Sequence, residues 1–284
     1  MKPPSYMRDL LLRCIEEDGG FGGDVTTNSL KISDATSTFA IHFRGSGTIA
    51  GLDPIAEAID VFGDVAITVL KSDGEVASDE NIALVQGETK NILFAERTIL
   101  NILGYSSGIA TRTRLFVDAV VGTPCSICDT RKTTPGLRHL DKYAVVCGGG
   151  TSHRLGLHDA ALYKDNHLSE LKDLQRDLGA AISSAREASA LQFVEVEVDT
   201  LAQLEKVLQL PVDIVLLDNM PPELLTEAVA IRDASDSSPQ LEASGGVTLE
   251  TVRSIAETGV DRISIGGLTH QATWIDVGLD AMDG

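Results

Sequence analysis

The stretch 193–218, FVEVEVDTLAQLEKVLQLPVDIVLLD, decides the fold class. Two short runs rich in Val, Ile and Leu, at 193–198 and 213–218, flank a segment with the apolar spacing of a helix. A strand, a helix and a second strand in this order favour two parallel strands with the helix packed outside them. The stretch therefore predicts an α/β fold built on a parallel sheet.

The same unit repeats on both sides of this stretch. Further short apolar runs at 126–130, 160–164, 240–244 and 262–266 bring the predicted strands to six. Amphipathic segments separate the later runs, and polar residues collect where each run ends, which is where a parallel barrel places its active site. The pattern favours an α/β barrel over a doubly wound sheet.

The first part of the chain has a different pattern. Residues 7–17 have the spacing of a short helix, and β-branched runs between 36 and 90 predict strands with one buried face. Residues 92–120 have helical periodicity that is interrupted near Gly104 to Gly108. This segment predicts two helices.

Composition argues against several classes of function. The chain has 284 residues and a net charge of −19, which repels nucleic acid backbones and anionic lipids. No stretch approaches the length of a membrane span, and acidic residues follow the amino terminus too soon for a signal peptide, so the cytoplasm is the expected compartment. The four cysteines, Cys14, Cys125, Cys128 and Cys147, are too few for a disulfide framework and are expected as thiols.

One cationic patch interrupts this acidity. Segment 129–167 holds six Lys or Arg against four Asp, and the patch comprises Arg131, Lys132, His153, Arg154 and Lys164. The clustering predicts a binding site for anionic ligands. Guanidinium groups bind carboxylates and phosphates through paired hydrogen bonds, so Arg131 and Arg154 suit a substrate with two carboxylates or a diphosphate.

The ends of the later strands carry acids and glycines. Glu197 and Asp218 end successive predicted strands, where they either form salt bridges with the cationic patch or hold a hard ion such as Mg²⁺. The next two strands end in Ser244, Gly245 and Gly246 and in Gly266 and Gly267. Because glycine lets a phosphate approach backbone N–H groups, these segments predict a phosphate site.

Several of these motifs resemble the quinolinate phosphoribosyltransferase family, also called nicotinate-nucleotide pyrophosphorylase (carboxylating). The likeness runs from about Asp24 to the end. The segments that carry it are DTRKTTPGLRHLDKYAVVCGGGTSHRLGLHDAALYKDNH (129–167), AERTILN (95–101), EVEVDT (195–200), VLLDNM (215–220), EASGGVTLE (242–250) and SIGGLTH (264–270).

The resemblance implies both a fold and a reaction. The fold is an open α/β sandwich at 1–120 joined to an incomplete parallel α/β barrel of about six strands at 121–270, with a helical segment at 271–284 that packs back on the first domain. In the reaction, phosphoribosyl pyrophosphate donates its phosphoribosyl group to quinolinate in the presence of Mg²⁺. Nicotinate mononucleotide, diphosphate and CO₂ are formed, a step of NAD biosynthesis.

The resemblance also assigns residue roles. Quinolinate would be bound by Arg131, His153 and Arg154, together with Arg97 from the neighbouring subunit of a homodimer or a hexamer of dimers. The implied catalytic residues are Lys132, Lys164, Glu197 and Asp218, of which the two acids serve the ribose and Mg²⁺. Phosphate would be cradled by Ser244, Gly245, Gly246, Gly266 and Gly267. Ser152 and Gly267 depart from the family pattern, which has an amide and a small methyl group there, and both bear on specificity.

Three alternatives stay open at this stage. The chain could be a paralogue of the same fold that acts on a different acid. It could be a Schiff-base lyase in which Lys164 forms an imine. It could also be a dicarboxylate sensor without catalytic activity. Diphosphate release, measured with quinolinate and with nicotinate, separates these hypotheses.

Overall fold

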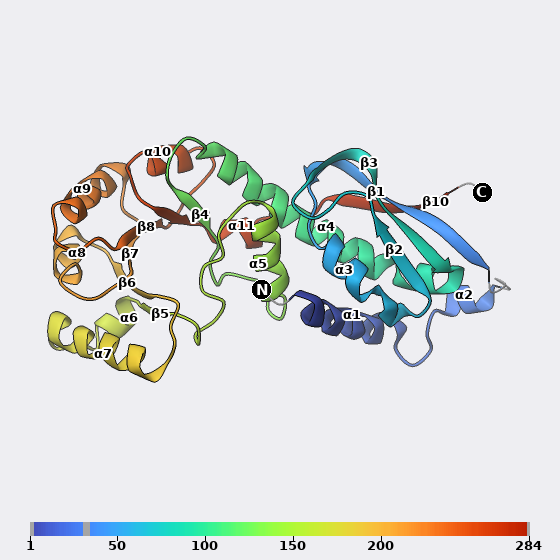
Figure 1. Ribbon diagram of the computed structural model, residues 1–284, viewed down its shortest axis with the longest axis horizontal. Coiled ribbons are helices and arrows are strands. Elements are labelled where there is room, and N and C mark those ends of the chain that lie inside the picture. Colours follow the sequence, from blue (N-terminus) through green and yellow to red (C-terminus); the bar gives the residue numbers. More distant parts are fainter. Residues whose placement is uncertain (1–2, 31–34, 283–284) are drawn as a thin grey trace. The chain divides into compact units, whose positions relative to one another are not determined.

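The computed structural model describes residues 3–30 and 35–282, so the ends of the expected segments 1–120 and 271–284 lie outside the described residues. The chain divides into two compact units (Figure 1). Unit 1 comprises Met1–Arg114, Thr134–Gly149 and Gln271–Gly284, and unit 2 comprises Leu115–Thr133 and Gly150–His270. The expected division at residue 120 therefore differs from the structure, chiefly because residues 134–149 join unit 1.

Unit 1 is built on a 4-stranded antiparallel sheet with the strand order β10-β1-β3-β2. Its elements are α1 (Pro3–Gly19), α2 (Val25–Ser29), β1 (Thr36–Thr48), α3 (Leu52–Ala58), the 3₁₀ helix η1 (Ile59–Phe62), β2 (Val65–Val69), β3 (Val76–Glu88), α4 (Thr89–Ala119), α5 (Arg138–Cys147) and β10 (Asp276–Ala281). Leu11, Phe43, Ile55 and Ile92 are buried together where the sheet packs against α1, α3 and α4.

Helix α4 is continuous, so the prediction of two helices is wrong. Gly104 and Gly108 lie within the helix and allow the segment 273–275 to pack against its backbone. A Cβ on Gly108 would lie 2.2 Å from the carbonyl oxygen of Thr273, and one on Gly104 would lie 2.7 Å from that of Ile275. The Ile275 N–H also donates to the Gly104 carbonyl at 3.0 Å. These glycines serve a close approach rather than a turn.

The helical segment expected at 271–284 is also wrong, because Asp276–Ala281 forms strand β10. This strand pairs antiparallel with β1, from Phe39 opposite Ala281 to Arg44 opposite Asp276. A helix of six residues with a central Gly278 is intrinsically weak. Pairing with β1 gives the same backbone groups their hydrogen-bond partners.

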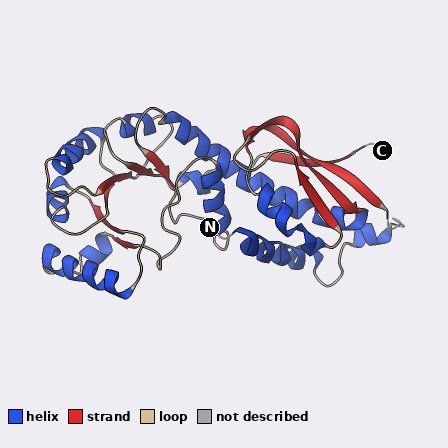
Figure 2. Cartoon of the chain, in the orientation of Figure 1, coloured by secondary structure: helices blue, strands red, loops and turns tan. Residues whose placement is uncertain are grey.

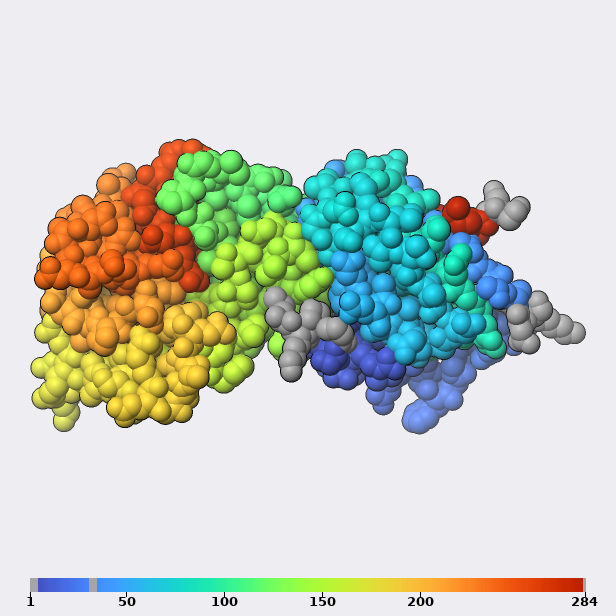
Figure 3. All heavy atoms as spheres, viewed as in Figure 1, coloured from blue at the N-terminus to red at the C-terminus, as the bar shows by residue number. Residues whose placement is uncertain are grey.

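Unit 2 is a 6-stranded parallel sheet with the order β4-β9-β8-β7-β6-β5, which confirms the predicted incomplete barrel. Helices lie outside the curved row of strands (Figure 2), and α9 lies at the surface in the orange region of Figure 3. The elements are β4 (Ser126–Cys128), β5 (Ala161–Tyr163), α6 (Asp165–Leu168), α7 (Leu174–Ala188), β6 (Val194–Val198), α8 (Leu201–Val207), β7 (Ile214–Asp218), α9 (Pro222–Asp233), β8 (Gln240–Ser244), α10 (Val252–Ala256), β9 (Arg262–Ser264) and α11 (Gly267–His270).

The helices that follow the central strands begin at residues that favour a helix start. Thr200 caps α8 by accepting a hydrogen bond from the Gln203 N–H at 3.2 Å, and the Gln203 side chain accepts in return from the Thr200 N–H. Pro222 occupies the start of α9, where the missing N–H of proline costs nothing. Each helix therefore begins soon after its strand, which leaves Glu197 and Asp218 at the carboxyl edge of the sheet.

Two further sequence predictions can be compared with the described residues. None of the helices in 3–30 and 35–282 is long and apolar enough to cross a membrane. All four cysteines are free thiols, as expected. Burial raises the pKa of both Cys125 and Cys128 to about 12, which makes them unreactive at neutral pH.

Candidate active site

The polar residues predicted at strand ends come together along one edge of the sheet in unit 2. Because the strands are parallel, their carboxyl ends share that edge. Lys164 follows β5, Glu197 lies in β6, Asp218 ends β7 and Ser244 ends β8 beside it in the register. Gly266 and Gly267 follow β9. The structure thus assembles these residues from five adjacent strands.

Lys164 and Glu197 form an ion pair across neighbouring strands. The Lys164 side chain is 44% exposed, whereas that of Glu197 is 9% exposed. Of the two roles considered for Glu197, salt bridging is therefore the one that the structure contains. Metal binding through Glu197 would require the carboxylate to be shared with Lys164 or released by it.

Asp218 is held by its neighbour Asn219. The Asn219 amide donates to Asp218 Oδ2 at 2.7 Å, and the Asn219 N–H donates to the Ser244 carbonyl at 2.8 Å. Asn219 adopts a left-handed backbone conformation with φ of 52°. Gly245 allows this arrangement, because a Cβ at Gly245 would lie 2.1 Å from Asn219 Oδ1. Asn219 thus links Asp218 to the glycine segment after β8, a role that the sequence analysis missed.

We expect Asn219→Ala to be less stable than Asn219→Gly by about 1 kcal/mol, because only glycine adopts the left-handed conformation without strain. Both variants lose the hydrogen bond to Asp218, so that comparison isolates the backbone. Chemical denaturation of the two proteins measures the difference. Equal free energies of unfolding would mean that the backbone relaxes and that the conformation is not imposed by the fold.

Lys132 is positioned by the segment after β9. The Thr269 hydroxyl donates to the Lys132 carbonyl at 2.6 Å, and the Lys132 side chain lies against Gly266. A Cβ on Gly266 would lie 2.6 Å from Lys132 Cδ, so the glycine leaves room for the lysine. This contact brings the loop after β4 to the loop after β9.

Arg154 lies near Arg131 in the loop before β5. Burial lowers the pKa of Arg154, and the positive charge of Arg131 lowers it further. Arg131 is exposed, and within the described residues its side chain has no hydrogen bond or ion pair. Two guanidinium groups that repel each other form a site prepared for an anion.

Asp159 fixes the loop that carries Arg154. Its carboxylate accepts hydrogen bonds from the Leu155 N–H at 2.7 Å and from the Gly156 N–H at 2.9 Å. These two bonds, with one from Arg154 Nη1 to the Ala160 carbonyl at 3.5 Å, shape the loop around the buried arginine. The loop is thus ordered before any ligand binds.

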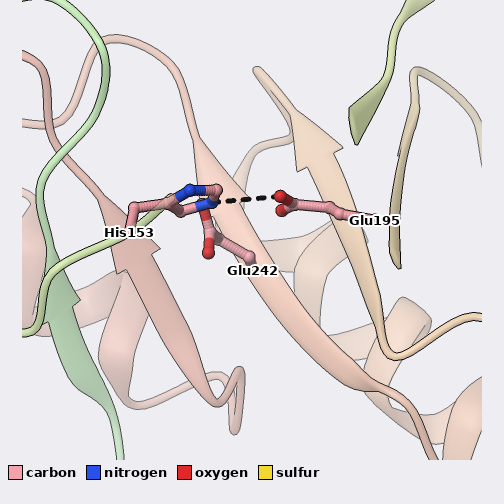
Figure 4. A group of neighbouring side chains, drawn as sticks. All are labelled: His153, Glu195 and Glu242. Atoms are coloured by element: carbon pink, nitrogen blue, oxygen red, sulfur yellow. Dashed lines mark ion pairs between the residues drawn. The ribbon is translucent and has the colours of Figure 1, made fainter. Parts of the chain in front are cut away.

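His153 is buried and points into the interior of unit 2 (Figure 4). Its Nε2 lies 3.0 Å from Glu195 Oε2 and 3.4 Å from Glu242 Oε1. Its Nδ1 accepts from the Arg154 N–H at 2.8 Å. Both ring nitrogens are therefore engaged by the protein, which argues against a direct bond from His153 to a substrate.

The protonation of this group is shared among its members. Burial and the nearby Glu242 raise the pKa of Glu195. Burial opposes ionisation of Glu242, but His153 and Arg262 lower its pKa. Burial would lower the pKa of His153, yet the two carboxylates raise it to about 9. Because Nδ1 accepts from the Arg154 N–H, Nε2 is the ring nitrogen that carries a proton toward the two carboxylates.

Sequence reasoning missed Glu195, Glu242 and Arg262. The signal was present, since Glu195 alternates with valines in VEVEV and Glu242 lies inside the apolar run QLEAS. An acid in the middle of a strand that is buried on both faces needs a partner. The partners lie on other strands and were not visible in the local sequence.

Arg97 belongs to unit 1, where it lies on α4. Its side chain is 70% exposed and its guanidinium pairs with the adjacent Glu96 at 3.1 Å. An exposed arginine with a single ion pair to a neighbouring residue is available for a further partner.

Comparison with known proteins identifies the family. The family model described as quinolinate phosphoribosyl transferase, C-terminal domain, matches residues 109–280, and the corresponding N-terminal domain matches residues 24–107. The chain belongs to the quinolinate phosphoribosyltransferase family. This family membership confirms the resemblance that the motifs indicated.

Relatives of this quinolinate phosphoribosyltransferase family chain match nearly its whole length. The nicotinate-nucleotide pyrophosphorylase [carboxylating] of Mycobacterium leprae is 42% identical over 96% of both chains. The structure of the nicotinate-nucleotide pyrophosphorylase from Francisella tularensis has a TM-score of 0.90 and 34% identity, and covers 99% of this chain and 98% of the other. That from Ehrlichia chaffeensis has a TM-score of 0.86 and 38% identity, with coverages of 96% and 98%. The family fold thus extends through both units.

Proposed function

We propose that this chain transfers the phosphoribosyl group of phosphoribosyl pyrophosphate to quinolinate and releases diphosphate and CO₂, giving nicotinate mononucleotide for NAD biosynthesis. The names of the curated relatives support this activity. The observation that carries it in the structure is the neighbouring Arg131 and Arg154 at the strand-end site. Two guanidinium groups match the two adjacent carboxylates of quinolinate.

In this proposal, the cationic side chains orient quinolinate. Arg131 and Arg154 bind its carboxylates, and Lys132 and Lys164 contact substrate charges. Orientation of the pyridine nitrogen toward the anomeric carbon converts an encounter of two anions into a reaction between held partners. His153 contributes from within the unit, because its ring is bonded to Glu195 and to the Arg154 backbone.

The phosphoribosyl side of the site contains Glu197, Asp218 and the two glycine segments. Backbone N–H groups of Ser244–Gly246 and Gly266–Gly267 would bind phosphate oxygens. Glu197 and Asp218 fit Mg²⁺ in donor chemistry, since they offer carboxylate oxygens from neighbouring strands and Mg²⁺ takes one or two carboxylates with phosphate oxygens and water. When bound, Mg²⁺ would neutralise charge on the departing diphosphate.

The proposed chemistry needs no covalent bond to the protein. The lone pair of the ring nitrogen forms a bond to the anomeric carbon as the bond from that carbon to diphosphate breaks. The carboxylates of Glu197 and Asp218 stabilise positive charge that develops on the ribose. The positive charge on the ring nitrogen then stabilises the electron pair left on C2 as the 2-carboxylate departs as CO₂, and a proton from water adds to C2 to give nicotinate mononucleotide.

The imine alternative is disfavoured by the surroundings of Lys164. A Schiff base requires a neutral amine that is free to attack a carbonyl. In the structure, the Lys164 amine is engaged by the Glu197 carboxylate. The ion pair suits a role in binding substrate charge.

We also propose a homodimer, or a hexamer of dimers, in which Arg97 of one subunit completes the quinolinate site of another. The support is the exposure of Arg97 together with the family membership. The free thiols suit the cytoplasm as the proposed compartment.

Diphosphate release tests this function directly. We expect kcat/KM with nicotinate to be at least about 100-fold lower than with quinolinate, because a missing carboxylate leaves a desolvated guanidinium unpaired. The assay measures diphosphate with each acid and excess phosphoribosyl pyrophosphate and Mg²⁺. Equal turnover of the two acids would reject quinolinate as the substrate. No turnover with either acid, but binding of quinolinate, would support a sensor.

A further inference from the structure

Four buried side chains inside unit 2 are not accounted for by direct substrate binding. This interior cluster consists of His153, Glu195, Glu242 and Arg262. Side chains two residues apart on a strand share a face, so Glu195 lies on the face of Glu197 and Glu242 on the face of Ser244. The cluster therefore forms the layer directly below these two residues of the site.

The cluster is closely connected. Glu242 lies at its centre, with Oε1 at 3.4 Å from His153 Nε2 and Oε2 at 2.9 Å from Arg262 Nε. Phe193 joins the other side, because its ring packs edge-on against His153 at 5.2 Å between centroids and lies 5.8 Å from the Arg262 guanidinium. Figure 4 shows the histidine directed at both carboxylates.

Such a cluster is a poor device for stability. Both glutamate side chains are fully buried, and taking charges out of water costs more free energy than their pairing often returns. Apolar side chains of the same volume would fill this interior at least as well. The cluster is therefore expected to have a role other than stability, and the contacts of His153 indicate that role.

His153 connects the cluster to the substrate arginine. Its ring Nδ1 accepts from the Arg154 N–H at 2.8 Å, and the His153 backbone N–H donates to Asp129 Oδ1 at 2.8 Å. The ring is fixed at one end by the carboxylates and at the other by the backbone from which Arg154 projects. A rotation of the ring would therefore move the base of the Arg154 side chain.

The same donor atoms could be read as a metal site. His153, Glu195 and Glu242 each offer one ligand atom within 4.8 Å of the others. However, one Glu242 oxygen already faces Arg262, and the imidazole nitrogen faces Glu195 at a normal hydrogen-bond distance. A cation bound here would also lie beside the Arg262 guanidinium without screening by water. The arrangement favours a closed cluster of ion pairs.

We propose that Glu195, Glu242 and Arg262 are positioning residues that act through His153 to hold Arg154 in the orientation that binds a carboxylate of quinolinate. This inference rests on the proposed function. It predicts a selective effect on quinolinate, since His153 is bonded to the backbone of Arg154, which the proposed function assigns to quinolinate and not to phosphoribosyl pyrophosphate. A merely structural role would instead affect both substrates or the stability of the fold.

The test uses Glu195→Gln, which keeps the shape of the side chain and removes its charge. We expect the Kd and KM of quinolinate to rise about tenfold or more, because small misplacements of a binding group cost rate and affinity steeply. The KM of phosphoribosyl pyrophosphate should stay within about twofold. The matched control is Glu227→Gln, an exposed position on α9, which should change neither constant.

A second variant guards against loss of folding. Glu242→Gln combined with Arg262→Gln removes both members of an ion pair, so no single buried charge is left without its partner. Thermal unfolding and calorimetric binding of quinolinate are measured on all proteins. The same selective rise in quinolinate constants is expected if at least one of the two variants folds.

The other outcomes overturn the inference. An unchanged quinolinate Kd in a folded variant, or an equal rise for both substrates, would remove the positioning role. Failure of both variants to fold would make the cluster a requirement of the fold alone. A tightly bound metal ion in the wild type that Glu195→Gln loses would make it a metal site. If wild-type protein neither binds nor converts quinolinate, the proposed function fails instead.

Discussion

Arg131→Ala is expected to lower kcat/KM for quinolinate by at least about 100-fold without loss of stability. Arg131 is exposed and has no ion pair within the described part of the chain, so the fold loses no contact with its guanidinium. Its charge also opposes that of the buried Arg154. Removing the Arg131 guanidinium relieves its repulsion of Arg154, which in the wild type an anionic substrate would balance.

Steady-state kinetics and thermal unfolding of the same preparation check this prediction. The control is Arg176→Ala, which removes an exposed arginine of α7 that pairs with Asp177. The control should retain full activity, because exposed ion pairs contribute about 0 to 1 kcal/mol and this one lies outside the site. A clear drop in the unfolding temperature of Arg131→Ala would show that the residue supports the fold.

Mixing two inactive variants is expected to restore activity. Arg97→Ala and Arg131→Ala should each be nearly inactive alone, and subunit exchange should recover about a quarter of wild-type activity. In a dimer whose sites take Arg97 from the partner, a mixed pair has one intact site and one site with both lesions. Random exchange makes about half of the dimers mixed, which gives that fraction.

Exchange must be proven independently, for example by mass spectrometry of differently tagged subunits. If Arg97 acts within its own chain, every site in the mixture carries one lesion. Activity would then stay at the level of the single variants after complete exchange, and the shared site would have to be abandoned. This experiment therefore tests both the assembly and the role of Arg97.

The strand-end residues could be predicted because parallel strands end at a common edge. Lys164, Glu197 and Asp218 each follow or close a recognisable apolar run, and the structure places them on the adjacent strands β5, β6 and β7. Only the order of strands along the chain was needed for this inference. The ion pair between Glu197 and Lys164 could be recognised only from the side-chain positions in the structure.

The interior cluster could not be predicted in the same way. Alternation in VEVEV indicates that Glu195 shares a face with Glu197, but its partners His153 and Glu242 come from a loop and another strand. Local pattern contains no information on such pairs. The sequence analysis expected His153 to bind substrate, because it lies beside Arg154 in the cationic patch. Its buried partners, Glu195 and Glu242, are distant in the sequence.

The wrong predictions of secondary structure involve segments that contain glycine. Gly104 and Gly108 resemble a helix break, and the sequence alone does not show that another segment approaches them closely. The prediction of a helix at 271–284 was wrong for a related reason, since pairing with the edge of β1 sets the conformation of β10. In both cases tertiary contacts override local propensity.

The pairing of β10 with β1 has a consequence for synthesis on the ribosome. The two strands that lie side by side are made far apart in time, with β1 complete at Thr48 and β10 only at Ala281. Throughout the synthesis of unit 2, the emerging chain exposes one unpaired edge of β1, which is a template for pairing with other chains. Unit 2 is continuous from Gly150 to His270 and can form its central strands in that interval. The six residues of β10 therefore complete a sheet that β1 began more than 200 residues earlier in the chain.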